Sequence, residues 1–452
     1  MSENNTSPFE KMNNRLRNSI TVRLITIGVL ILLLMIPVSM VEGLIRERQY
    51  RQESAVNEVS NKWGEQQTIK GPILSIPYKT FTKVYETNKT NKYKLVESIE
   101  FAHFLPEKLN VESVISPELR HRGIYEILVY NSDINISGNF VKPDFSEWNI
   151  KKDNIIWKDA FISLGLSDLR SIQENISLEW NKNTYYFNPG IETKDVISNG
   201  ISTRIDLSNI DSSKLLHNFN LNIDINGSSS INFIPLGKTT TVNVNSTWKT
   251  PSFDGAFLPD STEINDKGFS AMWKVLHLNR TYPQKFKGSV GGINESSFGV
   301  NLLIPVGEYQ KNMRSAKYAA MFITLTFLIF FFVQILNAVR IHPIQYIIVG
   351  LALCIFYTLL IGLSEHIPFD ISYLISSVLI VSLITFYAKN IFNNNKLTIV
   401  IGLLLSVLYL FIFSIIQMED YALLMGSIGL FLIISIIMYL SRKINWYSIK
   451  SE

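Results

Sequence analysis

The sequence has a single cysteine, Cys354, which lies inside a long apolar run, so no intramolecular disulfide can form. The motifs of common enzymes are also missing: there is no Gly-x-x-x-x-Gly-Lys phosphate loop, no Gly-x-Ser-x-Gly elbow and no His-Glu-x-x-His pair. The six histidines are scattered, and none stands at metal-ligand spacing from another. We therefore expect no enzyme, no cofactor and no metal site.

Charge is almost absent from the last third of the chain, which consists mainly of Ile, Leu, Phe and Val. The stretch from about Glu42 to Lys317 is instead rich in Asn, Ser, Thr and charged residues. An apolar fraction of 47% is too high for a wholly soluble protein and too low for one embedded entirely in a membrane. The composition therefore predicts an integral membrane protein with a large water-exposed domain.

Six segments are long and apolar enough to cross a bilayer, which takes about 20 residues of helix. They are 24–41, extended at its start by Ile20 and Val22, and then 316–339, 344–363, 369–388, 397–416 and 421–440. A cleaved signal peptide is the rival interpretation of the first segment. Its apolar run is longer than that of a usual signal peptide, and Val38, Ser39 and Met40 make a poor cleavage site.

The basic residues of the short loops and flanks predict the orientation, because Lys and Arg are retained on the cytoplasmic face. One side carries Lys11, Arg15, Arg17, Arg23, Arg340, Lys389, Lys396, Arg442, Lys443 and Lys450, whereas the loops 364–368 and 417–420 carry none. Both termini are therefore expected on the cytoplasmic side of the membrane. The predicted organisation is a cytoplasmic tail (1–19), a first transmembrane helix (20–41), a periplasmic domain (42–315), a five-helix bundle (316–440) and a cytoplasmic tail (441–452).

The periplasmic domain is predicted to start with a charged amphipathic stalk helix, 42–66, that packs on the rest of the domain or, alternatively, binds a partner. Beyond Gly71 and Pro72 the apolar residues alternate, which predicts strands in antiparallel sheets. Examples are 133–137, 220–226 and 241–245, with turn signals at Asn226-Gly227, Asn188-Pro189-Gly190, Leu236-Gly237 and Asp254-Gly255. A short helix is expected over 155–172. The predicted fold class is therefore a six-span α-helical membrane protein with an inserted, mainly β domain.

Acidic residues gather at the predicted outer rim of the bundle. Glu365, His366 and Asp370 lie in or beside one short loop, and Glu419 and Asp420 form the other. Such residues can be solvated or cap the next helix, dock onto arginines of the stalk, or take part in transport or proton transfer. The stalk arginines available for docking are Arg46, Arg48 and Arg51. The sequence leaves these three alternatives open.

The interior of the spans offers little functional polarity. Gln334 and Asn337 lie near the inner end of the second span, and the other polar residues are scattered Ser, Thr and Tyr. No charge stands near the hydrocarbon centre, which disfavours an ion-coupled transporter.

Several segments resemble the CreD family of inner-membrane proteins, also described as cell envelope integrity proteins. They are Ile36-Pro37, Glu42-Gly43-Leu44-Ile45, Glu47-Arg48, Trp63-Gly64, Gly71-Pro72-Ile73-Leu74, Leu278-Asn279-Arg280, Pro283-Gln284, Pro343, Gln345-Tyr346, Val349-Gly350-Leu351-Ala352, Leu363-Ser364-Glu365-His366, Glu419-Asp420-Tyr421-Ala422-Leu423-Leu424, Gly426-Ser427 and Trp446-Tyr447. They cover nearly the whole chain in the expected order. Asn445 departs from the acidic residue expected before Trp-Tyr.

The resemblance implies a Gram-negative inner-membrane protein, tied in some members to the Cre two-component system, with a role in envelope integrity and envelope stress but no established reaction. It adds Asn279 and Arg280 to the candidate residues. The plain interpretation is a turn stabilised by Asn279 with Arg280 on the sheet surface. The functional alternative is a periplasmic contact to a peptide, glycan or lipid head group.

The leading functional hypothesis is therefore an envelope-maintenance protein whose outer domain binds an unknown envelope component. The alternative is a lipid or small-solute permease that uses the acidic rim. A signalling receptor has too little cytoplasmic sequence for an output domain. The expected partners are the lipid bilayer and that envelope component, with no nucleic acid, and nothing in the sequence indicates an oligomeric state.

Overall fold

The computed structural model describes residues 20–85, 93–208, 215–302, 308–337, 339–418 and 421–442. The chain divides into two compact units. The helical unit comprises residues 1–53 and 306–452, and the β domain comprises residues 54–305. The β domain therefore begins and ends inside the expected range of 42–315.

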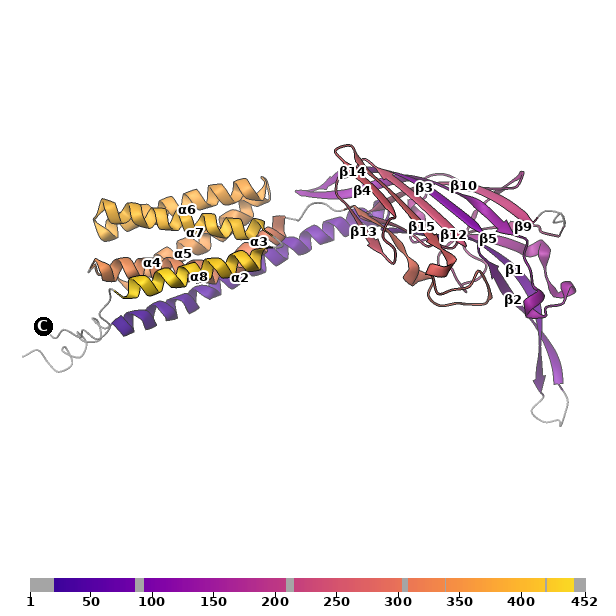
Figure 1. Cartoon of the computed structure of the whole chain (residues 1–452), viewed down its shortest axis with the longest axis horizontal. Helices are drawn as coiled ribbons and strands as arrows, with labels where there is room; N and C mark the ends of the chain where they lie inside the picture. Colours follow the sequence, from indigo (N-terminus) through magenta and orange to yellow (C-terminus); the bar gives the residue numbers. More distant parts are fainter. Residues whose placement is uncertain are drawn as a thin grey trace, which may run out of the picture. The chain divides into compact units, whose positions relative to one another are not determined.

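Helices α2 and α4–α8 are long and apolar enough to cross a membrane. The helices run in the order α2 (Ile20–Trp63), α3 (Glu308–Lys317), α4 (Ala319–Leu336), α5 (Pro343–Ser364), α6 (Phe369–Phe392), α7 (Asn395–Gln417) and α8 (Ala422–Ser441) (Figure 1). The predicted class, an integral membrane protein with six spans and an inserted β domain, is confirmed.

The first helix is longer than the sequence analysis expected. The predicted first span and the predicted stalk are one helix, α2, of 44 residues that continues through Pro37 and ends at Trp63. Its first part belongs to the helical unit, where Ile27, Leu34 and Ile45 are buried. Its last turns belong to the β domain, where Val59 and Trp63 pack against a small cluster that includes Val129. The expectation that the stalk packs on the outer domain is therefore confirmed for the end of α2.

Helix α3 was not expected as a separate element. It is short, its buried face contains Tyr309, Asn312 and Ser315, and it packs against α5, α6 and α7. Residues 308–315 therefore belong to the helical unit and not to the β domain. Their charges resemble those of a soluble segment, which is why the sequence analysis assigned them to the outer domain.

The β domain consists of two large sheets. The first has the order β13 (Pro251–Gly255), β17 (Phe298–Leu302), β11 (Ser230–Phe233), β1 (Gln67–Tyr85), β5 (Ala160–Leu166), β9 (Gly200–Ile205) and β8 (Asn188–Pro189), with β2 (Tyr93–Phe104) paired to β1 and β16 (Lys285–Lys287) paired to β2. The second has the order β14 (Ser261–Asn265), β15 (Gly268–Leu276), β12 (Thr239–Ser246), β3 (Lys108–Arg122), β4 (Tyr125–Val141), β10 (Leu216–Ser228), β6 (Ser177–Trp180) and β7 (Asn183–Tyr186).

The inner faces of the two sheets share one hydrophobic core. For example, Trp273 of β15 meets Phe298 of β17, a strand of the other sheet, with ring centroids 5.6 Å apart. The pairing is mainly antiparallel, as predicted, but β1 pairs with β11 and β3 with β12 in parallel. The three predicted strands are confirmed within β4, β10 and β12.

Two local predictions are wrong. The helix expected over 155–172 is instead strand β5 with short 3-10 turns on either side. All seven residues of β5 are buried, so the strand has an apolar run instead of the alternation that marks a half-buried strand. Asn226-Gly227 lies inside β10, and the left-handed turn residue is Ser229.

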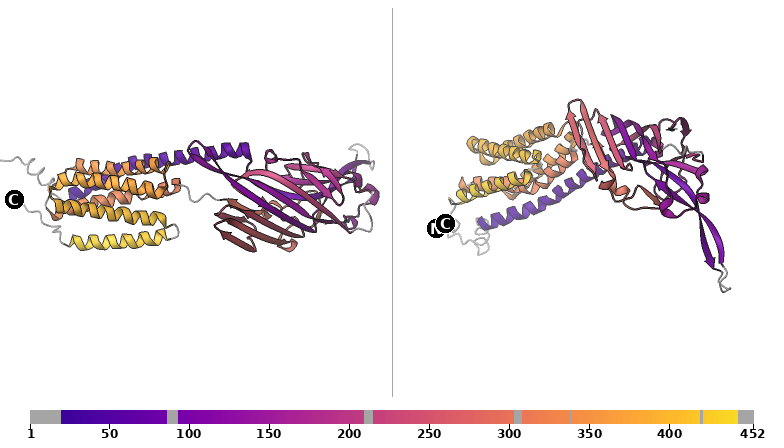
Figure 2. Two further views of the ribbon diagram at one scale, coloured as in Figure 1. Left: turned by 90° about the horizontal axis from the view of Figure 1, so that it is seen from above. Right: turned by 45° about the vertical axis from the view of Figure 1, so that its right-hand side comes forward.

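Strands β1 and β2 continue beyond their neighbours as a two-stranded ribbon, which Figure 1 and the right view of Figure 2 show. One face of this ribbon presents Phe81, Leu95 and Ile99, each about half exposed. Large apolar residues on an unpaired ribbon are a common mark of an interaction surface.

Candidate functional site

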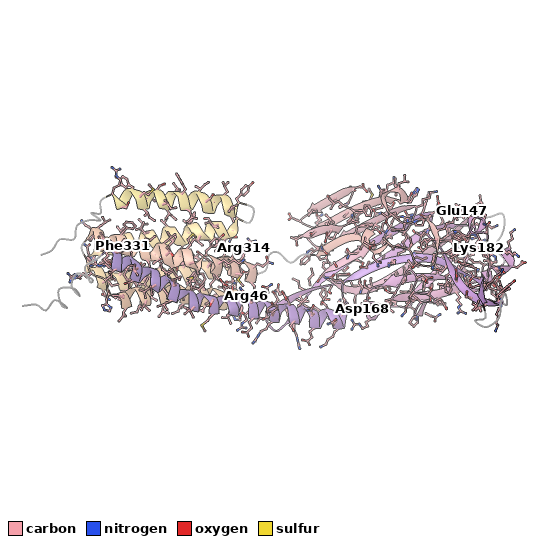
Figure 3. The ribbon with its side chains drawn as sticks, turned by 90° about the horizontal axis from the view of Figure 1, so that it is seen from below. Arg46, Glu147, Asp168, Lys182, Arg314 and Phe331 are labelled. Carbon is pink, nitrogen blue, oxygen red and sulfur yellow. The ribbon has the colours of Figure 1, made fainter. Side chains whose placement is uncertain are left out.

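Polar side chains of the helical unit gather around α3 and the turn between α5 and α6. Helix α5 ends at Ser364 and α6 begins at Phe369 after Pro368, whose fixed backbone angle suits a helix start. Glu365 and His366 therefore lie in a tight turn. Arg314 of α3 and Arg46 of α2 are labelled in the helical unit in Figure 3.

Glu365 is held by two partners within the helical unit. Its Oε1 lies 3.4 Å from Nε of Arg48 of α2 and accepts a hydrogen bond of 3.2 Å from the hydroxyl of Tyr309. Only 10% of the Glu365 side chain is exposed, so this ion pair is partly shielded from water. Of the three interpretations of the rim, docking onto the stalk arginines describes Glu365. The other two arginines pair on α2 itself, Arg46 with Glu42 and Arg51 with Glu47.

Buried amide and hydroxyl groups continue this cluster. The Nδ2 of Asn312 donates to Ser364 Oγ over 2.7 Å, and Ser364 Oγ donates to the carbonyl oxygen of Ile361 over 3.0 Å. Asn312 Oδ1 and Ser315 Oγ are also buried, and neither has a hydrogen-bond partner among the described residues. An unpaired buried polar atom costs free energy, so these two atoms are suited to a water molecule or a polar ligand group.

A second acid of α3 lies at the start of α6. The backbone N–H of Phe369 donates to the Glu308 carboxylate, which places a negative charge at a helix N-terminus. Burial nevertheless raises the pKa of Glu308, with Asp370 adding to the rise and Lys311 opposing it. The side-chain amide of Gln417 donates to Asp370 and so connects the start of α6 to the end of α7.

Of the other predicted rim residues, the structure describes only His366, which is exposed. Glu419 and Asp420 lie outside the described residues, so their role stays a prediction. The two polar candidates inside the spans have internal partners: Gln334 accepts from the Tyr346 hydroxyl over 2.9 Å, and Asn337 donates to the carbonyl oxygen of Val333 over 2.9 Å.

Arg280 is not on the sheet surface. It is 9% exposed, and its guanidinium donates to the carbonyl oxygens of Tyr282 and Leu236 over 2.9 and 3.2 Å and to the side chain of Gln284. Burial lowers its pKa. Asn279 Oδ1 accepts from the backbone N–H of Leu276 over 3.0 Å. Both side chains therefore have internal partners in the β domain. They hold neighbouring loops together and are not placed as contacts to a ligand.

The structure also brings together three residues that the sequence analysis missed. His103 Nδ1 lies 2.8 Å from Ser75 Oγ, and His103 Nε2 lies 3.2 Å from Asp195 Oδ2. Burial lowers the pKa of His103, and Asp195 partly opposes the shift. These residues come from β1, β2 and the loop before β9, so no sequence spacing could have revealed them.

This triplet lacks the surroundings of a hydrolase site. Ser75 is 2% exposed and sits in the middle of β1, paired on one side with His103 and on the other with Phe161. An oxyanion hole needs free N–H donors near the nucleophile. The backbone amides beside Ser75 already take part in sheet pairing, so they do not form such a hole. The arrangement is that of buried polar groups satisfying one another.

Among the residues that the structure describes, no group of three or more His, Cys, Asp or Glu side chains is placed to hold a metal ion. The fold and the polar cluster therefore define a multi-pass membrane protein in which a β domain is inserted between the first and second spans.

The comparisons with known proteins give the family. The model of the family described as "Inner membrane protein CreD" matches residues 19–447. The inner membrane protein CreD of Escherichia coli strain K12 is 30% identical over 421 residues, covering 92% of each chain. The chain belongs to the CreD family and is a multi-pass inner-membrane protein.

A likeness to one solved structure is weak. A mutant M1 zinc metallopeptidase from Deinococcus radiodurans is 8% identical, with a TM-score of 0.21 over 44% of this chain and 42% of that one. Similarity at this level carries no argument about fold or function.

Proposed function

We propose that this protein helps to maintain the bacterial cell envelope without catalysing a reaction, and that its β domain binds an envelope component in the periplasm. Both termini then lie in the cytoplasm. Membership of the CreD family supports the inner-membrane location. The basic residues at the start of α2, the end of α6 and the start of α7 support the orientation.

Helix α3 carries Lys311, Arg314 and Lys317, which this orientation places on the periplasmic side. These residues flank a domain of roughly 250 residues, and long translocated segments escape the charge rule. They therefore do not reverse the orientation.

The observation that carries the proposal is that α2 contributes to the core of both units. Ile45 and Arg48 are held in the helical unit, and Val59 and Trp63 pack in the β domain, all on one uninterrupted helix. A helix resists bending more than a loop does, so binding to the β domain can act on the membrane unit through α2.

The orientation can be tested with thiol labelling. Cys354 is the single cysteine of the sequence, so a Cys354→Ala background has no thiol of its own. Ser261→Cys on exposed β14 should react with a membrane-impermeant maleimide in cells whose outer membrane has been permeabilised. Asn390 is exposed near the C-terminal end of α6. Asn390→Cys should react only after the inner membrane is dissolved. The reverse pattern would overturn the orientation.

The binding role can be tested with a photo-crosslinking amino acid at Leu95, on the face of the β1–β2 ribbon that also presents Phe81 and Ile99, in cells under envelope stress. Thr262 on exposed β14 is the matched control position. We expect a crosslinked envelope component at Leu95 and not at Thr262, and we expect Leu95→Glu to abolish stress resistance at unchanged protein level. The absence of any specific product under every stress condition would contradict the proposal.

The second candidate is a lipid or small-solute permease that uses the acidic rim. The buried unpaired atoms of Asn312 and Ser315 favour it, because they offer polar contacts within the helical unit. It predicts that Glu365→Gln or Glu419→Gln abolishes resistance while membrane insertion stays intact, and that Glu42→Gln does not. Resistance unchanged in both rim variants would exclude the candidate.

A further inference from the structure

A groove runs along the seam between α6 and α7. Its larger part, about 540 Å³, begins at Asp370 and extends past Tyr373 and Tyr409. Its smaller part, about 420 Å³, ends at Lys389 and Thr398. Ser382 and Ser406 line both parts, so the two form one continuous groove.

The groove is about as long as the hydrocarbon core of a bilayer is thick. Asp370 and Lys389 are 19 residues apart on α6, which corresponds to about 28 Å of helix. The hydrocarbon core of a bilayer is about 30 Å thick, so one leaflet contributes only about 15 Å. A hydrocarbon chain that fills this groove is therefore longer than one leaflet.

The walls of the groove are mainly apolar and lie open to the lipid. Leu374, Val378 and Leu410 form part of the wall and are each more than half exposed. Tyr409 also lines the groove and is 3% exposed, and its hydroxyl has no hydrogen-bond partner among the described residues. Thr385 Oγ1 in the smaller part also has no hydrogen-bond partner among the described residues. The lining therefore suits a long chain more than a compact solute.

The two ends of the groove carry opposite charge. Lys389 lies at one end and has no ion-pair partner in the part of the chain that the structure describes. Asp370 lies at the other end, next to Gln417. A phosphate is attracted to the lysine end and repelled from the aspartate end. Two phospholipids, one from each leaflet, would require a head group at both ends.

We propose that the α6–α7 groove binds one anionic lipid whose single hydrocarbon chain exceeds the length of a leaflet, the chemistry of a polyprenyl phosphate. Its phosphate lies at Lys389, and its chain runs past Ser406 toward Tyr373 and Asp370. This site belongs to the membrane unit and is independent of any ligand of the β domain.

The test uses the full chain in phosphatidylcholine nanodiscs that contain undecaprenyl phosphate, followed by re-isolation and mass spectrometry of the retained lipid. The wild type should retain about one molecule per chain. Ser406→Trp fills the junction of the two parts and should lower retention roughly tenfold, a loss of about 1.4 kcal/mol in binding. Leu403→Trp adds the same ring on a 64% exposed position of α7 that does not line the groove, and should retain lipid as the wild type does.

The charge at the end of the groove is tested separately, without adding bulk. Lys389→Gln should reduce retention of undecaprenyl phosphate to the level of undecaprenol, which has no phosphate. Lys396→Gln, a neighbouring lysine outside the groove lining, should have no effect. Equal retention in Ser406→Trp and Leu403→Trp, or in Lys389→Gln and the wild type, would overturn the proposal. So would displacement of the polyprenyl lipid by phosphatidylglycerol at equal phosphate content.

Discussion

The two units differ in how their buried hydroxyl groups are paired. In the β domain the buried hydroxyls of Tyr282 and Ser75 have hydrogen-bond partners. Arg280 donates there to the carbonyl oxygen of Tyr282, although its Nε has no partner among the described residues. In the helical unit several buried hydroxyls have no partner among the described residues, including those of Ser315, Thr326, Ser376 and Tyr409. Paired hydroxyls help to fix one structure, whereas unpaired hydroxyls leave capacity for water or a ligand. Binding within the membrane unit is therefore expected at its interior hydroxyl groups.

The largest effect is expected where a buried hydrogen-bond network is broken in the β domain. Arg280→Leu removes a donor from the carbonyl oxygen of Tyr282 and the nearer donor from that of Leu236, which among the described residues keeps only Gln284 Nε2 at 3.5 Å. We expect a loss of about 3 kcal/mol in the free energy of unfolding. Urea unfolding followed by tryptophan fluorescence measures it, because every tryptophan except Trp446 lies in residues 54–305. Lys274→Ala, at an exposed position of β15, is the control and should change little. Equal stability of the two variants would mean that Arg280 does not hold these loops together.

A smaller loss is expected where α2 packs in the β domain. Trp63 donates from Nε1 to the carbonyl oxygen of Tyr130 over 3.2 Å, and the Arg120 guanidinium lies 3.5 Å from the centre of its ring. Trp63 is half-buried, so Trp63→Ala should cost about 2 kcal/mol, below the range for a fully buried ring. The same urea titration measures it. Asn61→Ala on the exposed side of α2 should be neutral, and a neutral Trp63→Ala would remove the argument that α2 is anchored in this domain.

The ion pair of the helical unit should contribute less. A double-mutant cycle with Arg48→Ala and Glu365→Gln should give a coupling of about 1 kcal/mol, because Arg48 is 36% exposed and water screens part of the attraction. Loss of helical circular dichroism in mixed micelles is the readout. The same cycle on the more exposed pair Arg46–Glu42 should give less than about 0.5 kcal/mol. Equal couplings would show that burial does not strengthen the Arg48–Glu365 pair.

The sequence predicts some of these features and not others. Runs of about 20 apolar residues and alternating strands are local patterns, so the spans and the strands within β4, β10 and β12 could be foreseen. Docking of Glu365 was one of three alternatives, since the charges on α2 and in the α5–α6 turn are visible in the sequence. Choosing among the alternatives required the position of Arg48 in space.

Other features depend on contacts between distant parts of the chain. Nothing near Arg280 in the sequence marks it as buried, because its acceptors include Leu236, 44 residues away. The fully buried strand β5 lacks the alternation that marks a half-buried one. Helix α3 is charged enough to resemble a soluble segment, and its buried polar face makes sense only against α5, α6 and α7.

The smallest expected effect tests the comparison most directly. Tyr409→Phe removes a hydroxyl that has no partner among the described residues, so it should leave the stability of the helical unit unchanged within about 0.5 kcal/mol. Tyr373→Phe, on the facing helix, removes a hydroxyl that donates to the carbonyl oxygen of Tyr409 over 2.9 Å and should cost about 1 kcal/mol. Both are measured by circular dichroism in mixed micelles. A cost for Tyr409→Phe as large as that for Tyr373→Phe would show that the Tyr409 hydroxyl is satisfied after all, by water or by a bound lipid. Repeating the pair of measurements in lipid-free micelles and in micelles with undecaprenyl phosphate separates these two sources, since only a bound lipid makes the cost depend on the lipid.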